Sequence, residues 1–84
     1  MRAENILSSE GWTKETRVII TGRREVLIEG HTGLFSYESG QIRIRSQDGI
    51  WTISGNHMMI EFFGLHDLLI RGNVESVSVR GEST

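Results

Sequence analysis

The chain contains no cysteine and no proline among its 84 residues. Without cysteine it forms no disulfide, and it offers no thiolate either as a nucleophile or as a ligand for zinc or an iron–sulfur cluster. This favours a reducing compartment. Proline commonly protects the edge strands of β-sheets, so its absence leaves open edges unprotected. The sequence is therefore compatible with a homo-oligomer formed by strand-edge pairing.

Long apolar runs are also missing. No stretch approaches the roughly 18 apolar residues of a transmembrane helix, and residues 1–7 lack the continuous apolar run of a signal peptide. We therefore expect a soluble, cytoplasmic protein without a transmembrane segment. The formal net charge of −2 argues against an affinity that comes from neutralising phosphates. Nucleic acid is accordingly not the expected partner.

Glycine provides the clearest sign of organisation. Eight of the ten glycines recur every 6–10 residues between positions 22 and 81, a pitch typical of short strands joined by turns. This predicts one all-β domain over residues 17–81, preceded by a leader over residues 1–16 that is irregular or helical around residues 2–8. The expected strands cover residues 17–22, 25–30, 33–38, 41–46, 50–54, 57–63, 67–71 and 74–80.

Apolar and polar residues alternate within several of these segments. In the segment 41–46, Ile42 and Ile44 are expected to face the core, while Arg43 and Arg45 face solvent. We expect about eight short, mostly antiparallel strands, folded as a sandwich, a roll or an open barrel. Several segments end in the pattern apolar, polar, glycine, which leaves a short β-solenoid as the alternative.

The turns between these strands can also be predicted. The segments 38–40 and 48–49 (Glu-Ser-Gly and Asp-Gly) favour tight hairpins, which would make residues 33–54 a three-strand meander. Gly55 and Gly72 each follow an apolar–polar pair, and we expect both to adopt positive φ in turns.

The residues that could carry catalysis are not arranged for it. His31, His57 and His66 are 26 and 9 residues apart, which is not the spacing of a metal site. No serine lies in a Gly-x-Ser-x-Gly motif, and the segment 30–33 is followed by a strand pattern rather than by a phosphate-binding helix. We therefore expect no enzymatic activity, no catalytic residue, no metal and no cofactor.

The densest apolar stretch covers residues 58–63. Continuous hydrophobicity predicts a strand that is covered on both faces. Phe62 and Phe63 should point to opposite sides, so that the core takes one ring and the other is covered by the leader or by another chain. The candidate protein interface consists of Trp12, Met59, Phe62 and Phe63.

Arginine supplies eight of the nine basic residues, which suggests an alternative function. A small β-barrel could bind nucleic acid or an anionic ligand through an arginine-rich face. The residues expected on that face are Arg23, Arg24, Tyr37, Arg43 and Arg45.

Four segments carry a resemblance to a known family. Residues 17–30, residues 42–49 with their Asp-Gly turn, residues 51–56 with an Ile-Ser-Gly turn, and residues 69–77 together resemble the YabP/YqfC family of bacterial sporulation proteins. The similarity extends over about residues 16–80. Each motif is common in β proteins, but their order and spacing are fairly specific.

This resemblance implies a spore-forming bacterium and a role in endospore formation within the mother cell. It implies no known enzymatic activity. The missing catalytic groups, the apolar run over residues 58–63 and the absence of proline lead us to expect a non-catalytic module for protein binding or assembly. The expected partner is a protein, with a membrane protein of the developing spore as one candidate. The implied location is the mother-cell cytoplasm or the periphery of the forespore surface.

Overall fold

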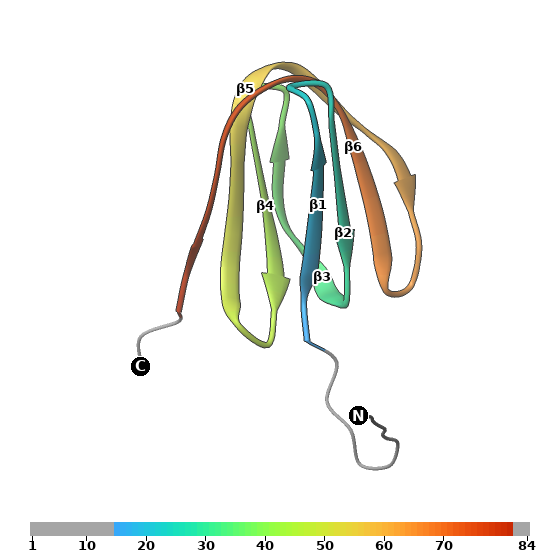
Figure 1. The fold of residues 1–84 in the computed structure, drawn as a ribbon. Helices are drawn as coiled ribbons and strands as arrows, with labels where there is room; N and C mark the ends of the chain where they lie inside the picture. The colour runs from blue at the N-terminus through green and yellow to red at the C-terminus, as the bar shows by residue number, and fades with distance from the viewer. Residues whose placement is uncertain (1–14, 82–84) are drawn as a thin grey trace.

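The computed structural model describes residues 15–81, so nearly all of the predicted leader, including its helical segment, lies outside the described residues. The described part contains strands and no helix. All strands pair antiparallel in one open sheet with the order β1-β2-β6-β5-β4-β3 (Figure 1). The strands are β1 (Arg17–Thr21), β2 (Glu25–Glu29), β3 (His31–Glu38), β4 (Gln41–Ser46), β5 (Gly49–Phe63) and β6 (Asp67–Arg80).

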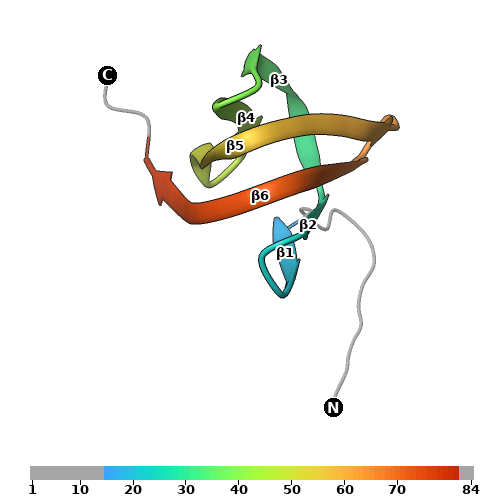
Figure 2. The same ribbon diagram turned by 90° about the horizontal axis from the view of Figure 1, so that it is seen from above.

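The long strands β5 and β6 arch together over one end of the molecule and fold the sheet into two layers (Figure 1). Before the arch, residues 49–54 of β5 pair with β4; on its other side, residues 67–71 of β6 pair with β2. The first layer contains β3, β4 and residues 49–54 and 76–80, and the second contains β1, β2 and residues 59–63 and 67–71. Seen from above, β4 and β1 lie on opposite sides of the β5–β6 ribbon (Figure 2).

The core lies between the layers and contains inward side chains from both. Val26, Ile28, Leu68 and Ile70 of the second layer belong to the same buried cluster as first-layer residues such as Ile53. Every second residue of a strand points to the same face, and this periodicity gives each layer one inward face. Full burial of one such side chain stabilises the folded chain by about 1.5–3 kcal/mol.

Two glycines permit the arch. A Cβ on Gly55 would collide with the backbone oxygen of Asn73, and a Cβ on Gly72 would lie 2.6 Å from the Cα of Met58. The two strands therefore approach each other so closely that neither position has room for a side chain. Gly72 has φ +150°, whereas Gly55 has no positive φ.

The prediction of turns at these two glycines is wrong, although the positive φ predicted with it is confirmed for Gly72. Both lie inside continuous strands, so the predicted segments 50–54 and 57–63 join into β5, and 67–71 and 74–80 join into β6. Six strands result instead of eight, although all eight segments are extended. The β-solenoid alternative is also wrong, because β2 pairs antiparallel with the distant β6 rather than stacking in a repeating coil.

The predicted meander is confirmed, with one shift. β3, β4 and β5 are neighbours, and Glu38 pairs with Gln41 across the first hairpin. In the second hairpin Ser46 pairs with Gly49, so the two turn residues are Gln47 and Asp48 rather than Asp48 and Gly49.

The face assignment in β4 is confirmed for both isoleucines and for one arginine. Ile42 and Ile44 are fully buried, and Arg45 is exposed. Arg43 is only half-buried, because its guanidinium carbon lies 4.8 Å from the centre of the Phe35 ring.

Candidate functional site

The outer side of the second layer carries a row of apolar side chains across four strands. Ile19 pairs with Leu27, Leu27 with Leu69, and Leu69 with Phe62, so all four point to the same outer side. Strands lie about 4.8 Å apart, which makes this row roughly 14 Å long. Phe62 is 55% exposed and Ile19 is 36% exposed, while the two leucines are half-buried. We call these four residues the apolar row.

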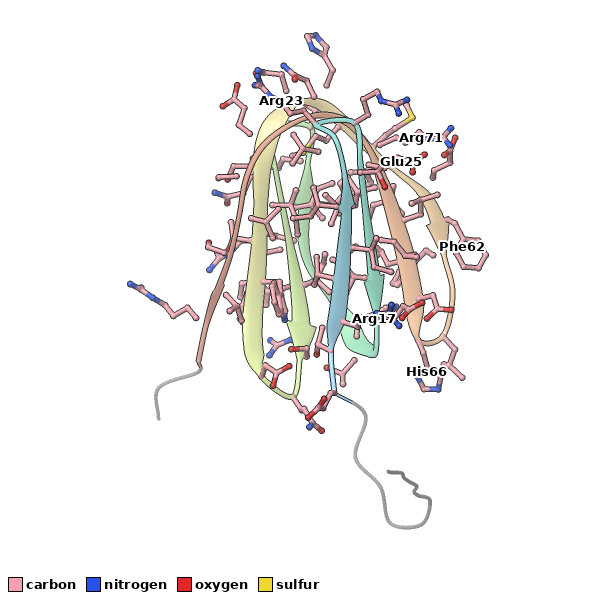
Figure 3. All side chains as sticks on the ribbon, in the orientation of Figure 1. Arg17, Arg23, Glu25, Phe62, His66 and Arg71 are labelled. Atoms are coloured by element: carbon pink, nitrogen blue, oxygen red, sulfur yellow. The ribbon has the colours of Figure 1, made fainter. Side chains whose placement is uncertain are left out.

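Ion pairs border the apolar row on both sides. Arg71 lies between two carboxylates, 2.7 Å from Glu25 and 2.9 Å from Glu61. The hydrogen bond to Glu25, together with the charge of Glu61, raises the pKa of the Arg71 guanidinium. On the other side, Arg17 lies 3.9 Å from Glu29. Figure 3 shows Arg71 beside Glu25, and Phe62 projecting away from the ribbon.

Carboxylates outnumber guanidinium groups on this outer side. On the described strands its charged residues are Arg17, Glu25, Glu29, Glu61, Asp67 and Arg71, which gives a net charge of −2. We call this surface, together with the apolar row, Thr21 and Met59, the acidic face. An apolar centre with a charged rim is the usual composition of a protein-binding surface.

Three of the four residues of the predicted interface lie in the described part, and Trp12 lies outside it. Met59 and Phe62 belong to the acidic face, and Met59 is 57% exposed. Phe63 pairs with Leu68 and therefore points to the opposite side from Phe62, as expected. The prediction that the core takes one of the two rings is wrong, because Phe63 is 52% exposed and Phe62 is 55% exposed.

Phe63 lies at the rim of the core, beside a buried histidine. Its ring centre is 5.3 Å from that of His31. The Nε2 of His31 is 3.0 Å from the carbonyl oxygen of Gly64, and the carbonyl oxygen of His66 accepts hydrogen bonds from the amides of Gly30 and His31. These contacts attach the β2–β3 corner to the β5–β6 loop. His31 is thus part of the structural framework.

The five residues of the predicted ligand face do not come together. Arg23 and Arg24 lie in the β1–β2 turn, where their carbonyl oxygens accept hydrogen bonds from the amides of Val74 and Gly72. Tyr37 pairs with Ile42 and so points inward, and its hydroxyl accepts a hydrogen bond of 3.0 Å from the amide of Ile60.

Arg43 and Arg45 do lie together, on the outer side of the first layer. Both guanidinium carbons are within 5 Å of the Phe35 ring centre, at 4.8 and 4.7 Å. Arg80 lies on the same outer side, because it pairs with Ile50 and Ile50 pairs with Arg45. We call this surface the arginine face; its members include Phe35, Arg43, Arg45, Ile50, Thr52, Ser78 and Arg80, with Glu38 at one corner.

Within residues 15–81, no group of three or more histidine, aspartate or glutamate side chains is arranged to hold a metal ion. His57 and His66 are exposed, at the arch and in the β5–β6 loop, whereas His31 is buried. No helix in this part of the chain is long and apolar enough to cross a membrane.

The apolar row was missed by the sequence interpretation, which considered only the run over residues 58–63. Three other segments contained the signal: residues 18–20, 26–28 and 68–70 are each three consecutive apolar residues. In a strand, the central residue of such a triplet points away from its two neighbours. Those central residues are Ile19, Leu27 and Leu69.

Comparisons with known proteins cover nearly the whole chain. Residues 13–84 match the model of the YabP family. A relative from Bacillus subtilis (strain 168), named "Uncharacterized protein YqfC", is 28% identical over 61 residues. That alignment covers 73% of this chain and 66% of the relative, so it spans slightly less than two thirds of the relative's length.

Proposed function

Because the chain belongs to the YabP family, we propose that it is a non-catalytic module for protein binding or assembly during endospore formation. Membership of this family suggests a sporulation-related protein. In our proposal the module works in the mother cell, in the cytoplasm or at the periphery of the forespore surface. Its partner is a protein, with a membrane protein of the developing spore as a candidate.

The observation that carries the proposal is the apolar row on the acidic face. Phe62 is 55% exposed, which leaves about 110 Å² of a ring of about 200 Å² in contact with water. If a partner covers that area, the free energy of binding gains up to about 2.7 kcal/mol at about 25 cal/mol per Å². This corresponds to roughly a hundredfold in affinity. Protein partners cover such surfaces, whereas a small anionic ligand does not.

The charged rim gives this face a way to select its partner. The ion pairs of Arg71 with Glu25 and Glu61 lie at the solvent-exposed border of the apolar row. Charges at such a border contribute little affinity, but they disfavour partners with the wrong charge pattern. A partner of this face therefore presents an apolar or aromatic patch with basic residues around it.

The competing function, binding of nucleic acid or an anionic ligand, has weaker support. Of its five residues, Arg43 and Arg45 lie on the arginine face, whereas Arg23 and Arg24 lie in the β1–β2 turn. Tyr37 points inward from the edge of the first layer. A binding face for a polyanion requires several basic side chains along one track.

The proposal is tested by Phe62→Ser in the native spore-forming host, with Leu65→Ser as the matched control. Leu65 is 84% exposed in the β5–β6 loop and is not part of the apolar row. We expect Phe62→Ser to reduce the yield of heat-resistant spores at least tenfold, at unchanged protein level and unfolding temperature. A normal spore yield for Phe62→Ser, or an equal loss for Leu65→Ser, would contradict the proposal.

A further inference from the structure

The two outer sides of the molecule carry opposite charge. The acidic face has a net charge of −2, from four carboxylates and two arginines. On the arginine face, counting residues 15–81 alone, Arg43, Arg45 and Arg80 outnumber the single carboxylate of Glu38, which gives a net charge of +2. The core lies between them, so the two faces point in opposite directions.

From this complementarity we propose that the arginine face of one copy of the chain docks on the acidic face of the next. The inference rests on the proposed function, because it names a second copy as an occupant of the same apolar row. Opposite charges on two approaching surfaces favour the encounter and fix its orientation.

The arginine face also offers contacts that suit the apolar row. Arg43 and Arg45 are held over the ring of Phe35, which is itself 42% exposed. Ile50, half-buried, lies beside them on the same face. Planar guanidinium groups and aromatic rings pack well against an exposed phenylalanine such as Phe62.

The geometry makes this association open-ended. A dimer with two-fold symmetry uses the same patch on both copies, whereas docking between two different patches leaves one unused face at each end. Each added copy presents a new acidic face or a new arginine face. The expected product is a linear series of species rather than a dimer.

The expected affinity of one copy of the chain for the next is low. Four strands about 4.8 Å apart, with about five residues at 3.3 Å each, give a face of roughly 300 Å² in projection. A typical stable interface buries about 800 Å² per partner. Association should therefore appear only at high protein concentration and should weaken as added salt shortens the Debye length below about 10 Å.

The test is sedimentation velocity of the purified 84-residue chain from about 10 µM to about 1 mM, a range suited to weak association. We expect the average mass to rise continuously with concentration and to fall when salt is raised. A monomer at every concentration overturns the proposal, and so does a dimer that does not grow further.

Two variants, each with one face weakened, distinguish this mode from any other. Arg43→Gln/Arg80→Gln neutralises the arginine face, and Phe62→Ser/Asp67→Asn weakens the acidic face. Each variant alone should associate at least tenfold more weakly than the natural chain. Arg24→Gln, which removes one positive charge in the β1–β2 turn outside both faces, should associate normally.

Mixing the two variants in equal amounts is the decisive step. The intact acidic face of the first can bind the intact arginine face of the second, and growth then stops. We expect a mass of two chains in the mixture, and a mixture that stays monomeric overturns the proposal. If the natural chain is monomeric while Phe62→Ser still lowers spore yield, self-docking is wrong and the docking of another protein stands.

Discussion

The two layers of this small sheet use the same inward periodicity but differ in what they present to solvent. In the first layer, β4 alternates buried isoleucines with outward arginines, as in residues 42–45, and residues 76–79 of β6 alternate outward serines with inward valines. In the second layer the triplets 26–28 and 68–70 are apolar on both sides of the strand. The outer side of the first layer is therefore mainly polar, with Phe35 and Ile50 as exceptions, whereas the second layer is apolar on both sides.

This difference separates the needs of folding from the needs of binding. Alternation is sufficient to build the core, as the fully buried Ile42 and Ile44 demonstrate. The outward apolar residues of the second layer, Ile19 and Phe62 among them, make no such contribution to the core. A surface of this kind promotes association, and we attribute it to function rather than to stability.

The largest expected effect comes from comparing adjacent residues of β6 that point inward and outward. Ile70→Ala leaves a cavity at a fully buried position and should lower the free energy of unfolding by about 2–5 kcal/mol. Leu69→Ala truncates a half-buried side chain of the apolar row and should lower the free energy of unfolding by less than half as much as Ile70→Ala. Equilibrium unfolding in urea measures both values. Equal losses would show that the outward row is part of the core.

A somewhat smaller effect is expected at the arch that joins the layers. Gly55→Val places a side chain against the backbone of Asn73 and should destabilise the chain by at least about 1 kcal/mol. Gly81→Val is the matched control, because a Cβ there meets nothing within 4 Å. Thermal unfolding followed by circular dichroism compares the two. If Gly55→Val is as stable as the control, the arch does not need the close approach of β5 and β6.

The arch also defines how much of the fold could be predicted from the sequence. All eight extended segments and the meander over residues 33–54 followed from glycine spacing and alternation. Glycine permits both a tight turn and a close approach of two backbones. Local sequence does not distinguish these cases, and at Gly55 and Gly72 the approach of the partner strand decided between them.

The candidate site was predicted less completely, for a similar reason. Phe62 and Met59 were identified because they lie in one continuous apolar run. Ile19, Leu27 and Leu69 come from three other strands, and only the register of β1, β2 and β6 brings them into one row with Phe62. The proximity of Arg80 to Arg45 likewise depends on the pairing of β6 with β5.

The smallest effect on stability is expected where the open edges of the two layers meet. Tyr37→Phe removes the hydroxyl that accepts a hydrogen bond from the amide of Ile60, linking β3 in the first layer to β5 in the second. The free energy of unfolding should fall by about 0.5–1.5 kcal/mol, which is typical of the loss of one hydrogen bond. Amide hydrogen exchange at Ile60 should accelerate in this variant. Unchanged exchange would show that the hydroxyl does not hold the two edges together.

The central claim is that another protein chain covers the apolar row in the cell. A photo-crosslinking phenylalanine analogue at position 62 tests it most directly, since a ring that is 55% exposed tolerates the substitution. During sporulation, irradiation should attach a second chain at position 62, and mass spectrometry identifies it as another copy or a different protein. The same analogue at Leu65 should give little or no adduct. Absence of any adduct at position 62, or equal labelling at both positions, would contradict the account.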